Sequence, residues 1–263
     1  MGATVSVLRQ ARRLVGRAIR SVPWLRRQWE VSTDYRLIGE AELGGGSASG
    51  WFSPLTAWRQ DRAYGKLLID MHRGAPRDDL HIAVQAIDVL GLPQATVLEV
   101  GCGSGYYHEI LDTLAHTSIA YTGVDFSPAM IARAKRRYPG ADFRQMDGTA
   151  LAFRDGAFDV AFNGVSLMHI PDWRKAVAES RRVAQVACIF HSVPVFPSRP
   201  TAHLAKYAYG APVTETVFNR DELVACFRDN GLAVRQSWRG LIYDVFDVAG
   251  EHSYDETFLC VPA

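Results

Sequence analysis

Short apolar runs alternate with helical patterns from residue 95 onward. The runs that predict strands are 95–100, 119–125, 142–145, 158–163 and 186–190. Helical spacing follows them to about residue 114, from 128 to 138 and from 172 to about 184. Strands that alternate with helices form right-handed βαβ units, so we predict a parallel sheet that is covered by helices on both faces.

The pattern changes after the fifth run. A helix is predicted over 220–230, Gly231 follows it, and two apolar runs, 232–238 and 254–261, come next with no helix between them. Two strands joined by a long loop can pair antiparallel at one edge of a sheet. We therefore predict that one α/β domain extends over residues 93–263.

Two further parts precede this domain. Glycine and serine fill most of residues 44–50, a composition typical of a flexible linker, which closes an N-terminal arm over residues 1–50. Helical spacing then covers roughly 54–71 and 80–90, with a break at Gly74-Ala75-Pro76. We predict that residues 51–92 form a helical cap whose apolar faces cover another part of the protein.

The amino-acid composition limits the classes of protein to which this chain can belong. The 263 residues suit one large domain, or one domain with an appended segment, and 48% apolar with 22% charged residues is ordinary globular usage. The four cysteines have no C-x-x-C pair and no metal-ligand spacing, so we expect no metal site and a reducing, cytoplasmic setting. No apolar run approaches the roughly 18 residues of a membrane span, and we expect no secretory signal.

The net charge of +1 argues against bulk electrostatic binding of nucleic acid, but it is the sum of two unlike parts. Residues 1–30 hold seven Arg and one Glu, a net +6, and the remainder holds 22 basic against 27 acidic residues, a net −5. We therefore expect a mildly acidic body that binds no nucleic acid, joined to a cationic arm.

The cationic arm is amphipathic at helical spacing. One face of the predicted helix carries Val5, Leu8, Ala11, Val15, Ala18, Ile19 and Val22. Arginines occupy the other face, Pro23 stops the helix, and Trp24 and Trp29 follow. This composition is typical of a segment that lies in an anionic membrane interface, which would make the protein peripheral to a membrane. The alternatives for residues 5–29 are docking on this protein or on a partner, a mitochondrial presequence, and disorder.

A glycine-rich turn carries the sharpest chemical signal. The predicted strand that ends at Val100 runs into Gly101, Gly103 and Gly105, and a helical pattern begins at Tyr106. Glycines at the carboxyl end of a strand let a ligand approach the backbone closely, which indicates a nucleotide-like cofactor. The dinucleotide fingerprint G-x-G-x-x-G needs its third glycine where Tyr106 stands, so the spacing does not fit a pyrophosphate turn.

Two acidic residues end the next two predicted strands. Asp125 can accept both hydroxyls of a ribose, and Asp147 can accept the exocyclic amine of an adenine. The alternative for both is an ordinary helix N-cap or turn residue. Because the glycine loop and both acids follow three consecutive strands, we expect them at one edge of the sheet.

These residues resemble the class I S-adenosylmethionine-dependent methyltransferases, whose first motif is an acidic residue followed by G-x-G-x-G. The resemblance covers roughly residues 96–263, and includes an Asp-x-Ser-x-x-Met form at 125–130 and a stretch at 158–163 similar to the family's fourth motif. It implies an α/β fold with a seven-stranded, mostly parallel sheet of strand order 3-2-1-4-5-7-6. It also implies S-adenosylmethionine as cofactor and a small-molecule methyl acceptor.

The resemblance further implies roles toward the methionine half of the cofactor. Glu99 would orient the glycine loop and approach the methionine amino group. Gly101, Gly103 and Gly105 would line the methionyl and ribose portion, and Asn163 would end the fourth strand where the reactive methyl points toward the acceptor.

For the adenosine half, the resemblance makes Asp125 the residue that binds the ribose hydroxyls. The residues implied around the adenine are Phe126 and Met130 at its flanks and Asp147, Gly148 and Thr149 at its edge. For Phe126 and Met130 the alternative is ordinary core filling, because apolar residues at helix starts are usually core.

Methyl transfer to an oxygen needs a base, and few candidates exist. His169 follows the fourth predicted strand and His191 ends the fifth. The alternatives are a packing role for His169 and a satisfied polar residue for His191. Asn163 is followed by Gly164-Val165-Ser166, so the amine-methylating N-P-P-Y pattern is absent, which favours an oxygen acceptor.

Further acceptor and cofactor contacts are expected from segments that cover the sheet edge. The family places substrate lids in segments such as 197–219, which includes Lys206, Tyr209 and Glu215. Gln60 and Tyr64 share a helical face and can close over the cofactor, or form part of a helix interface. A glycan precursor or a lipid-linked acceptor would fit the arm. Two other functions stay open: a non-catalytic cofactor-binding or scaffold protein, and a nucleotide-dependent oxidoreductase.

Overall fold

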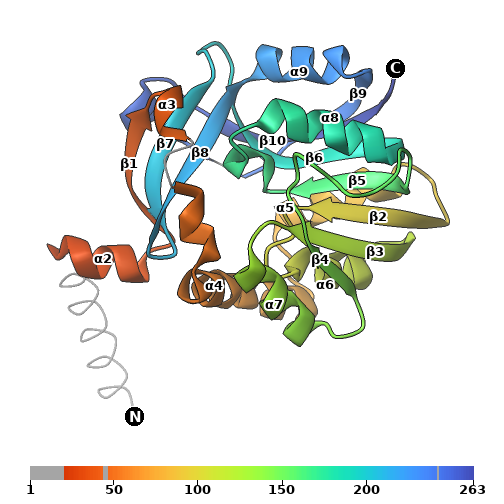
Figure 1. Ribbon diagram of the computed structural model, residues 1–263, viewed down its shortest axis with the longest axis horizontal. Coiled ribbons are helices and arrows are strands. Elements are labelled where there is room, and N and C mark those ends of the chain that lie inside the picture. Colours follow the sequence, from red (N-terminus) through yellow and green to blue (C-terminus); the bar gives the residue numbers. More distant parts are fainter. Residues whose placement is uncertain (1–20, 44–46, 242) are drawn as a thin grey trace.

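The predicted alternation of strands and helices is present in the computed structural model, which describes residues 21–43, 47–241 and 243–263 (Figure 1). The central parallel strands are β2 (Gln94–Val100), β3 (Ser118–Asp125), β4 (Asp142–Gln145), β5 (Phe158–Gly164) and β6 (Ala184–Phe196). The helices between them are α6 (Tyr106–Leu114), α7 (Pro128–Arg137) and α8 (Trp173–Val183).

The C-terminal strands take the places that the resemblance implied. After α9 (Arg220–Asp229), β9 (Leu232–Arg239) pairs antiparallel with β10 (Tyr254–Pro262), and β10 inserts beside β6, also antiparallel. The path β4-β3-β2-β5-β6-β10-β9 therefore has the expected order 3-2-1-4-5-7-6.

The expected count of seven strands was wrong, because the sheet has ten strands within the described residues. The additional strands are β1 (Ser32–Ile38), β7 (Ala202–Ala208) and β8 (Ala211–Asn219). Segment 197–219, expected as a lid, forms an antiparallel β7–β8 hairpin whose turn residues Tyr209 (φ 52°) and Gly210 (φ 79°) both have positive φ. The hairpin joins the main sheet where Val195 of β6 lies beside Phe218 of β8, and β1 pairs with its outer edge.

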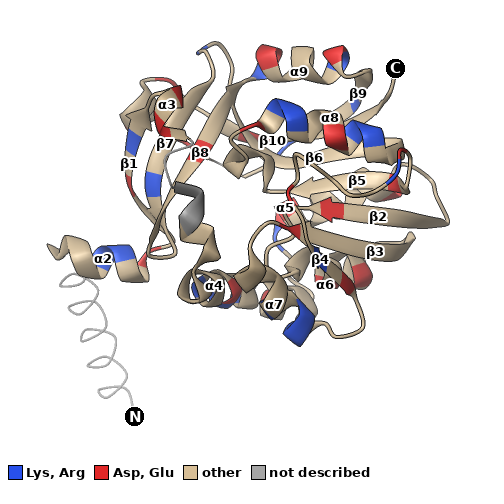
Figure 2. Cartoon of the chain, viewed as in Figure 1, with Lys and Arg blue, Asp and Glu red and all other residues tan. Residues whose placement is uncertain are grey.

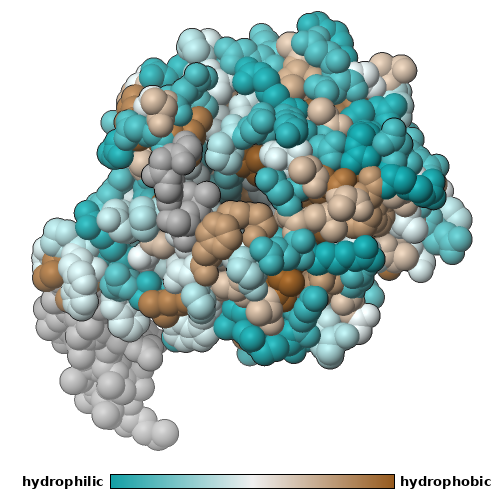
Figure 3. Space-filling view, in the orientation of Figure 1, coloured by the Kyte–Doolittle hydropathy of each residue, from teal (hydrophilic) through white to brown (hydrophobic). Residues whose placement is uncertain are grey.

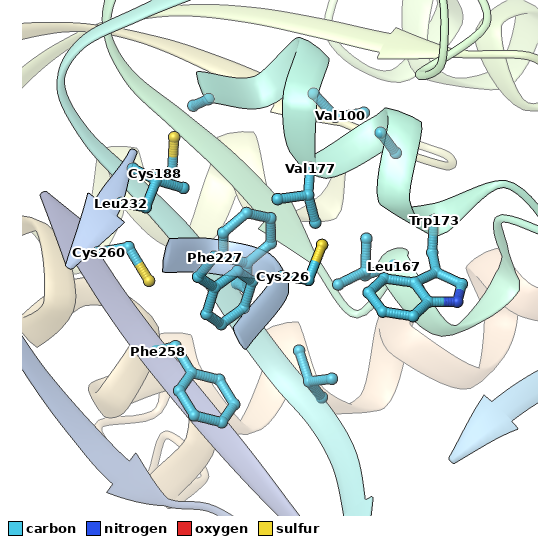
Figure 4. Packing of buried hydrophobic residues seen from close by; sticks show 14 of the residues in the cluster. Val100, Leu167, Trp173, Val177, Cys188, Cys226, Phe227, Leu232, Phe258 and Cys260 are labelled. Atoms are coloured by element: carbon cyan, nitrogen blue, oxygen red, sulfur yellow. The ribbon is translucent and has the colours of Figure 1, made fainter. Parts of the chain in front are cut away.

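The sheet divides the core into two layers. Neighbouring residues of β2 point to opposite faces, so Leu98 packs with α8 and α9, and Val97 packs with the helices of the cap. Figure 4 shows the first layer, in which Phe227 of α9 packs against Phe258 of β10 with ring centroids 5.5 Å apart. The four cysteines are buried and form no disulfide.

The helical cap is built from α4 (Pro54–His72) and α5 (Asp78–Asp88). Its core side chains, among them Leu68 and Leu80, pack with Ile110 of α6. Short helical turns complete the described chain: α3 (Glu40–Leu43), η1 (Ser47–Phe52), η2 (Leu167–His169) and α10 (Phe246–Ala249).

The N-terminal segment contributes to the sheet. The amphipathic helix predicted up to Val22 lies outside the described residues except at its last two positions, and α2 (Pro23–Trp29) begins at Pro23. Asp34 of β1 accepts hydrogen bonds from Arg26 at 2.5 Å and from Arg27 at 2.6 Å. These contacts fix α2 to β1, so residues 23–38 form part of the folded body.

Candidate functional site

A cavity of about 590 Å³ lies at the carboxyl ends of β2, β3, β4 and β5. This is the edge where open α/β sheets bind ligands, in the crevice outside the carboxyl ends of the strands. The cap and the β1–β7–β8 strands form the other walls. The cavity is within the size range of small-molecule sites, about 300–1,000 Å³.

The glycine loop lines this cavity through Gly101 and Gly103, whose φ angles are 77° and 54°. A Cβ at Gly101 would lie 2.4 Å from the Cβ of Ser166, so no other residue fits there without displacing the backbone. A Cβ at Gly103 would lie 3.1 Å from Oε1 of Gln60. Gly105, the N-cap of α6, faces Phe143 in the core and is not among the lining residues.

Asp125 lies at the cavity wall directly beyond this loop. The Gly103 N–H donates to its Oδ2 at 2.9 Å, and the Ser127 N–H donates to its Oδ1 at 2.8 Å. Burial raises the pKa of Asp125 to about 6, against the lowering effect of these two hydrogen bonds. Each carboxylate oxygen keeps a lone pair, so the side chain can still accept two hydroxyl groups.

The residues expected around an adenine line the same cavity. They are Phe126, Met130, Asp147, Gly148 and Thr149. Thr149 donates to Oδ1 of Asp147 at 2.8 Å from both its backbone N–H and its hydroxyl. Phe126 meets the exposed ring of Phe52 edge to face at 5.1 Å, and Met130 is 2% exposed and packs with Trp51.

Gln60 and Tyr64 of α4 also line the cavity. Oε1 of Gln60 is buried and has no hydrogen-bond partner within the described part of the chain. Tyr64 stacks on Tyr106 of α6 with centroids 3.9 Å apart. The helical face singled out in the sequence therefore covers the glycine loop.

Glu99 and Asn163 are not among the residues that line the cavity. Glu99 is fully buried, one of its oxygens accepts the Tyr121 hydroxyl, and Oε1 has no partner among the described residues. Burial raises the pKa of Glu99 to about 8. Asn163 lies in the core, where its Nδ2 donates to the Ser180 hydroxyl at 3.1 Å. The cofactor roles of both residues stay predictions.

His191 is likewise absent from the cavity lining. It sits at a bulge where His191 and Ser192 of β6 face the single residue Thr257 of β10, whose hydroxyl lies 2.8 Å from Nδ1 of His191. Its ring packs against Tyr107 and Phe162, and burial lowers its pKa to about 4. The structure therefore gives His191 a core position and no contact with the cavity.

His169, in contrast, lines the cavity from η2. Its Nδ1 lies 3.0 Å from the carbonyl oxygen of Thr214, and a carbonyl can only accept, so Nδ1 carries the proton. In the neutral ring Nε2 then has a free lone pair. Burial, with a contribution from the nearby Lys206 ammonium, lowers the pKa of His169. The ring is therefore neutral at pH 7 and in the tautomer of a base.

Sequence reasoning missed most of the cavity wall that β1, the β7–β8 hairpin and β10 provide, which is the far end of the cavity from the glycine loop. Its lining includes Tyr35 of β1, Tyr243 from the segment before β10, Asp255 of β10, and Lys206 and Tyr209 of the hairpin. Only the last two lie in the segment that the sequence singled out. No local pattern connects these residues, because strands that are distant in the chain bring them together.

A buried ion pair holds this far end. Lys206 pairs with Glu215 across the hairpin, and the blue band on β7 lies beside the red band on β8 in Figure 2. The Tyr243 hydroxyl donates to the same Glu215 carboxylate. Nζ of Lys206 also lies 5.3 Å from the centroid of the Tyr35 ring.

Comparisons with known proteins find similarity to methyltransferases over the centre of the chain. Residues 98–190 match the family model described as a methyltransferase domain. A demethylmenaquinone methyltransferase of Renibacterium salmoninarum is 35% identical over 100 residues, which are 38% of this chain and 41% of that protein. A phthiotriol/phenolphthiotriol dimycocerosates methyltransferase of Mycobacterium tuberculosis is 35% identical over 113 residues, 42% of this chain and 40% of that protein. The chain spans about two fifths of the length of these relatives.

Solved structures extend the likeness to the fold. The magnesium protoporphyrin IX methyltransferase of Synechocystis PCC 6803, with bound S-adenosylmethionine, has a TM-score of 0.54 at 18% identity. The match covers 88% of this chain and all of that one (100%). At this identity it is the arrangement of helices and strands that is shared.

Proposed function

We infer that this chain is a class I S-adenosylmethionine-dependent methyltransferase, and on that premise we propose that it transfers a methyl group to an oxygen atom of a small-molecule acceptor. The observation that carries the proposal is one cavity in which the glycine loop, Asp125 and a neutral His169 all form part of the wall.

The residues at the near end of the cavity suit the cofactor. Asp125 presents two acceptor oxygens for the ribose hydroxyls, and Gly101 and Gly103 leave backbone space beside them. Phe126 and Met130 supply apolar surface for the adenine, and the Asp147 loop supplies polar atoms for its edge. Gln60 covers the loop from α4, and its unpartnered oxygen is available to a ligand donor.

The residues of the chain then position and deprotonate the acceptor. When bound, S-adenosylmethionine would supply an electrophilic methyl group for the acceptor oxygen, and the electron pair of the broken carbon–sulfur bond would stay on sulfur. His169 Nε2 takes the proton of the acceptor hydroxyl, and the Thr214 carbonyl holds the ring in the required tautomer. The cavity walls exclude water and align the two reactants, which is the main contribution that an in-line displacement needs.

Two measurements test this function and separate it from its alternatives. Calorimetry should show binding of S-adenosylhomocysteine and none of NAD; tight NAD binding would favour the oxidoreductase. The protein is then incubated with a small-molecule extract and S-adenosylmethionine that carries a deuterated methyl group. A new deuterated methyl product supports transfer. Binding without any such product would favour the non-catalytic protein.

The N-terminal segment supports a membrane-bound acceptor, such as a lipid-linked molecule. Among the described residues, none of the helices combines the length and the hydropathy of a membrane-spanning segment. Trp24 and Trp29 of α2 are 66% and 69% exposed. Figure 3 shows small apolar areas, within mostly pale surface, over α2 and beside α4. Exposed tryptophans next to an arginine-rich segment favour binding at an anionic interface. We propose that residues 5–29 hold the protein at such a surface.

Replacing both tryptophans tests this surface. We expect Trp24→Ser/Trp29→Ser to reduce cosedimentation with phosphatidylglycerol vesicles by about fivefold or more, because two interfacial anchors are lost. Phe246→Ser is the control, since it removes an exposed ring outside the arm. Equal cosedimentation of all three proteins would exclude the tryptophans as anchors and favour docking on a partner. Deletion up to Gly50 is unsuitable, because it would also remove β1 from the sheet.

A further inference from the structure

The far end of the cavity contains a carboxylate that is not fully hydrogen bonded. Asp255 of β10 lines the cavity although only 8% of it is exposed. Its Oδ2 accepts the Ser192 hydroxyl over a long 3.4 Å, and its Oδ1 has no partner among the residues that the structure describes. A buried acceptor without a donor costs free energy, so a ligand that supplies the donor would be favoured.

The neighbouring polar groups are already engaged. Lys206 and Tyr243 both bind Glu215, and Ser192 binds Asp255 itself. The Lys206 ammonium and the Tyr243 and Ser192 hydroxyls are therefore held by protein carboxylates. Oδ1 of Asp255 is a buried acceptor that these groups leave without a donor. Burial raises the pKa of Asp255 to about 7, so the carboxylate is mostly ionised at pH 8.

Aromatic side chains line much of the same cavity. They come from η1, α4, α6, β1, the hairpin and the segment before β10: Tyr35, Trp51, Tyr64, Tyr106, Tyr209 and Tyr243. Trp51 and Tyr209 lie with ring centroids 6.1 Å apart, and Trp51 also meets the ring of His169 at 5.1 Å. Such walls favour flat, apolar molecules, which stack on the rings.

We propose that Asp255 selects and orients the methyl acceptor, which is a ring-bearing, largely apolar molecule with a hydroxyl or amino group that donates a hydrogen bond to Oδ1 of Asp255. This inference rests on the proposed function. Asp255 acts here by binding the acceptor, whereas His169, next to Trp51, takes the proton. A site built to accept a hydrogen bond discriminates strongly against an analogue that lacks the donor.

Two probes of similar shape test the role of Asp255. Calorimetry of the full chain at pH 8, saturated with S-adenosylhomocysteine, compares 2-naphthol with 2-methoxynaphthalene, in which the donor is blocked. We expect the unchanged protein to bind 2-naphthol about tenfold or more tightly than the methoxy probe. Asp255→Leu should abolish this preference, and Asp255→Asn, which keeps one acceptor oxygen, should retain part of it.

The control removes another carboxylate from the wall of the same cavity. Asp172 is exposed there, and Asp172→Leu should keep the full preference. Equal affinity for the two probes in the unchanged protein, failure of both to bind, or an undiminished preference in the Asp255 variants would overturn the proposal. If Asp255→Leu does not fold, Asp255→Asn carries the test. Failure to bind S-adenosylhomocysteine would instead reject the proposed function, and the probes can then be compared without it.

Discussion

Asp125→Asn is expected to bind S-adenosylhomocysteine about 100-fold or more weakly than the unchanged chain. The two oxygens of Asp125 accept different backbone donors, Gly103 N–H at 2.9 Å and Ser127 N–H at 2.8 Å. Asparagine has one acceptor oxygen, so its NH2 group would face one of these donors. The substitution therefore disturbs the glycine loop and removes a charged acceptor of the ribose hydroxyls. A hydrogen bond to a charged group contributes about 1.5–3 kcal/mol, or roughly tenfold or more, and two such bonds are weakened.

Calorimetry with S-adenosylhomocysteine measures this effect, and Asp172→Asn is its matched control. Asp172 is an exposed carboxylate at the wall of the same cavity, so the control makes the same change of charge without touching the loop. The control should bind like the unchanged chain. An affinity of Asp125→Asn within about threefold of the unchanged chain would show that Asp125 is only a turn residue.

His169→Asn is expected to lower kcat by about 100-fold or more, the range that a general base contributes, with little change in S-adenosylhomocysteine affinity. Asparagine can still donate to the Thr214 carbonyl that now lies 3.0 Å from Nδ1, but it has no basic lone pair. The measurement is initial rate on the acceptor identified by deuterium transfer. His81→Asn, an exposed histidine on α5, is the control.

The pH profile distinguishes a base from a packing residue. The pKa of His169 is lowered from 6.5 by burial and by Lys206, so the base form is lost only as the pH falls below this lowered pKa. With cofactor and acceptor both saturating, so that the titration of Asp125 and Asp255 affects binding and not kcat, the unchanged chain should therefore have a flat kcat near pH 7 and an acid limb below it. His169→Asn should lose that limb. Equal kcat and equal profiles for the two proteins would assign His169 to packing.

The strands of the main sheet could be located because each has a local signature, and their order was implied by the resemblance to a known family. The run ending at Val100 precedes a glycine loop, and the run ending at Asp125 precedes a helix that Ser127 caps by accepting from Met130 N–H. The hairpin could not be predicted in this way. Its turn, Tyr209-Gly210, lacks the Asn-Gly or Asp-Gly that usually marks one, and the pairing of β1 with β7 joins segments far apart in the sequence.

The residues of the site likewise divide into those that a local sequence pattern could place and those that depend on long-range strand pairing. Positions near Gly101 and Asp125 could be placed at the cavity because backbone geometry at a strand end fixes them. Asn163 and His191 lie in strands, where a bulge or a single residue of register decides which face a side chain takes. Asp255 depends on the pairing of β10 with β6, which no local pattern contains.

The origin of the cavity walls has a consequence for how specificity can evolve. The family match ends at residue 190, and Tyr35, Lys206, Tyr243 and Asp255 all lie outside it. Tyr35 is six positions from Trp29, the exposed end of α2, on the same continuous segment. Recombination that exchanged this segment would change both the proposed membrane-binding segment and a wall of the proposed acceptor pocket in one event. The cofactor-binding part of the cavity would be inherited unchanged. Membrane binding and acceptor specificity would therefore change together.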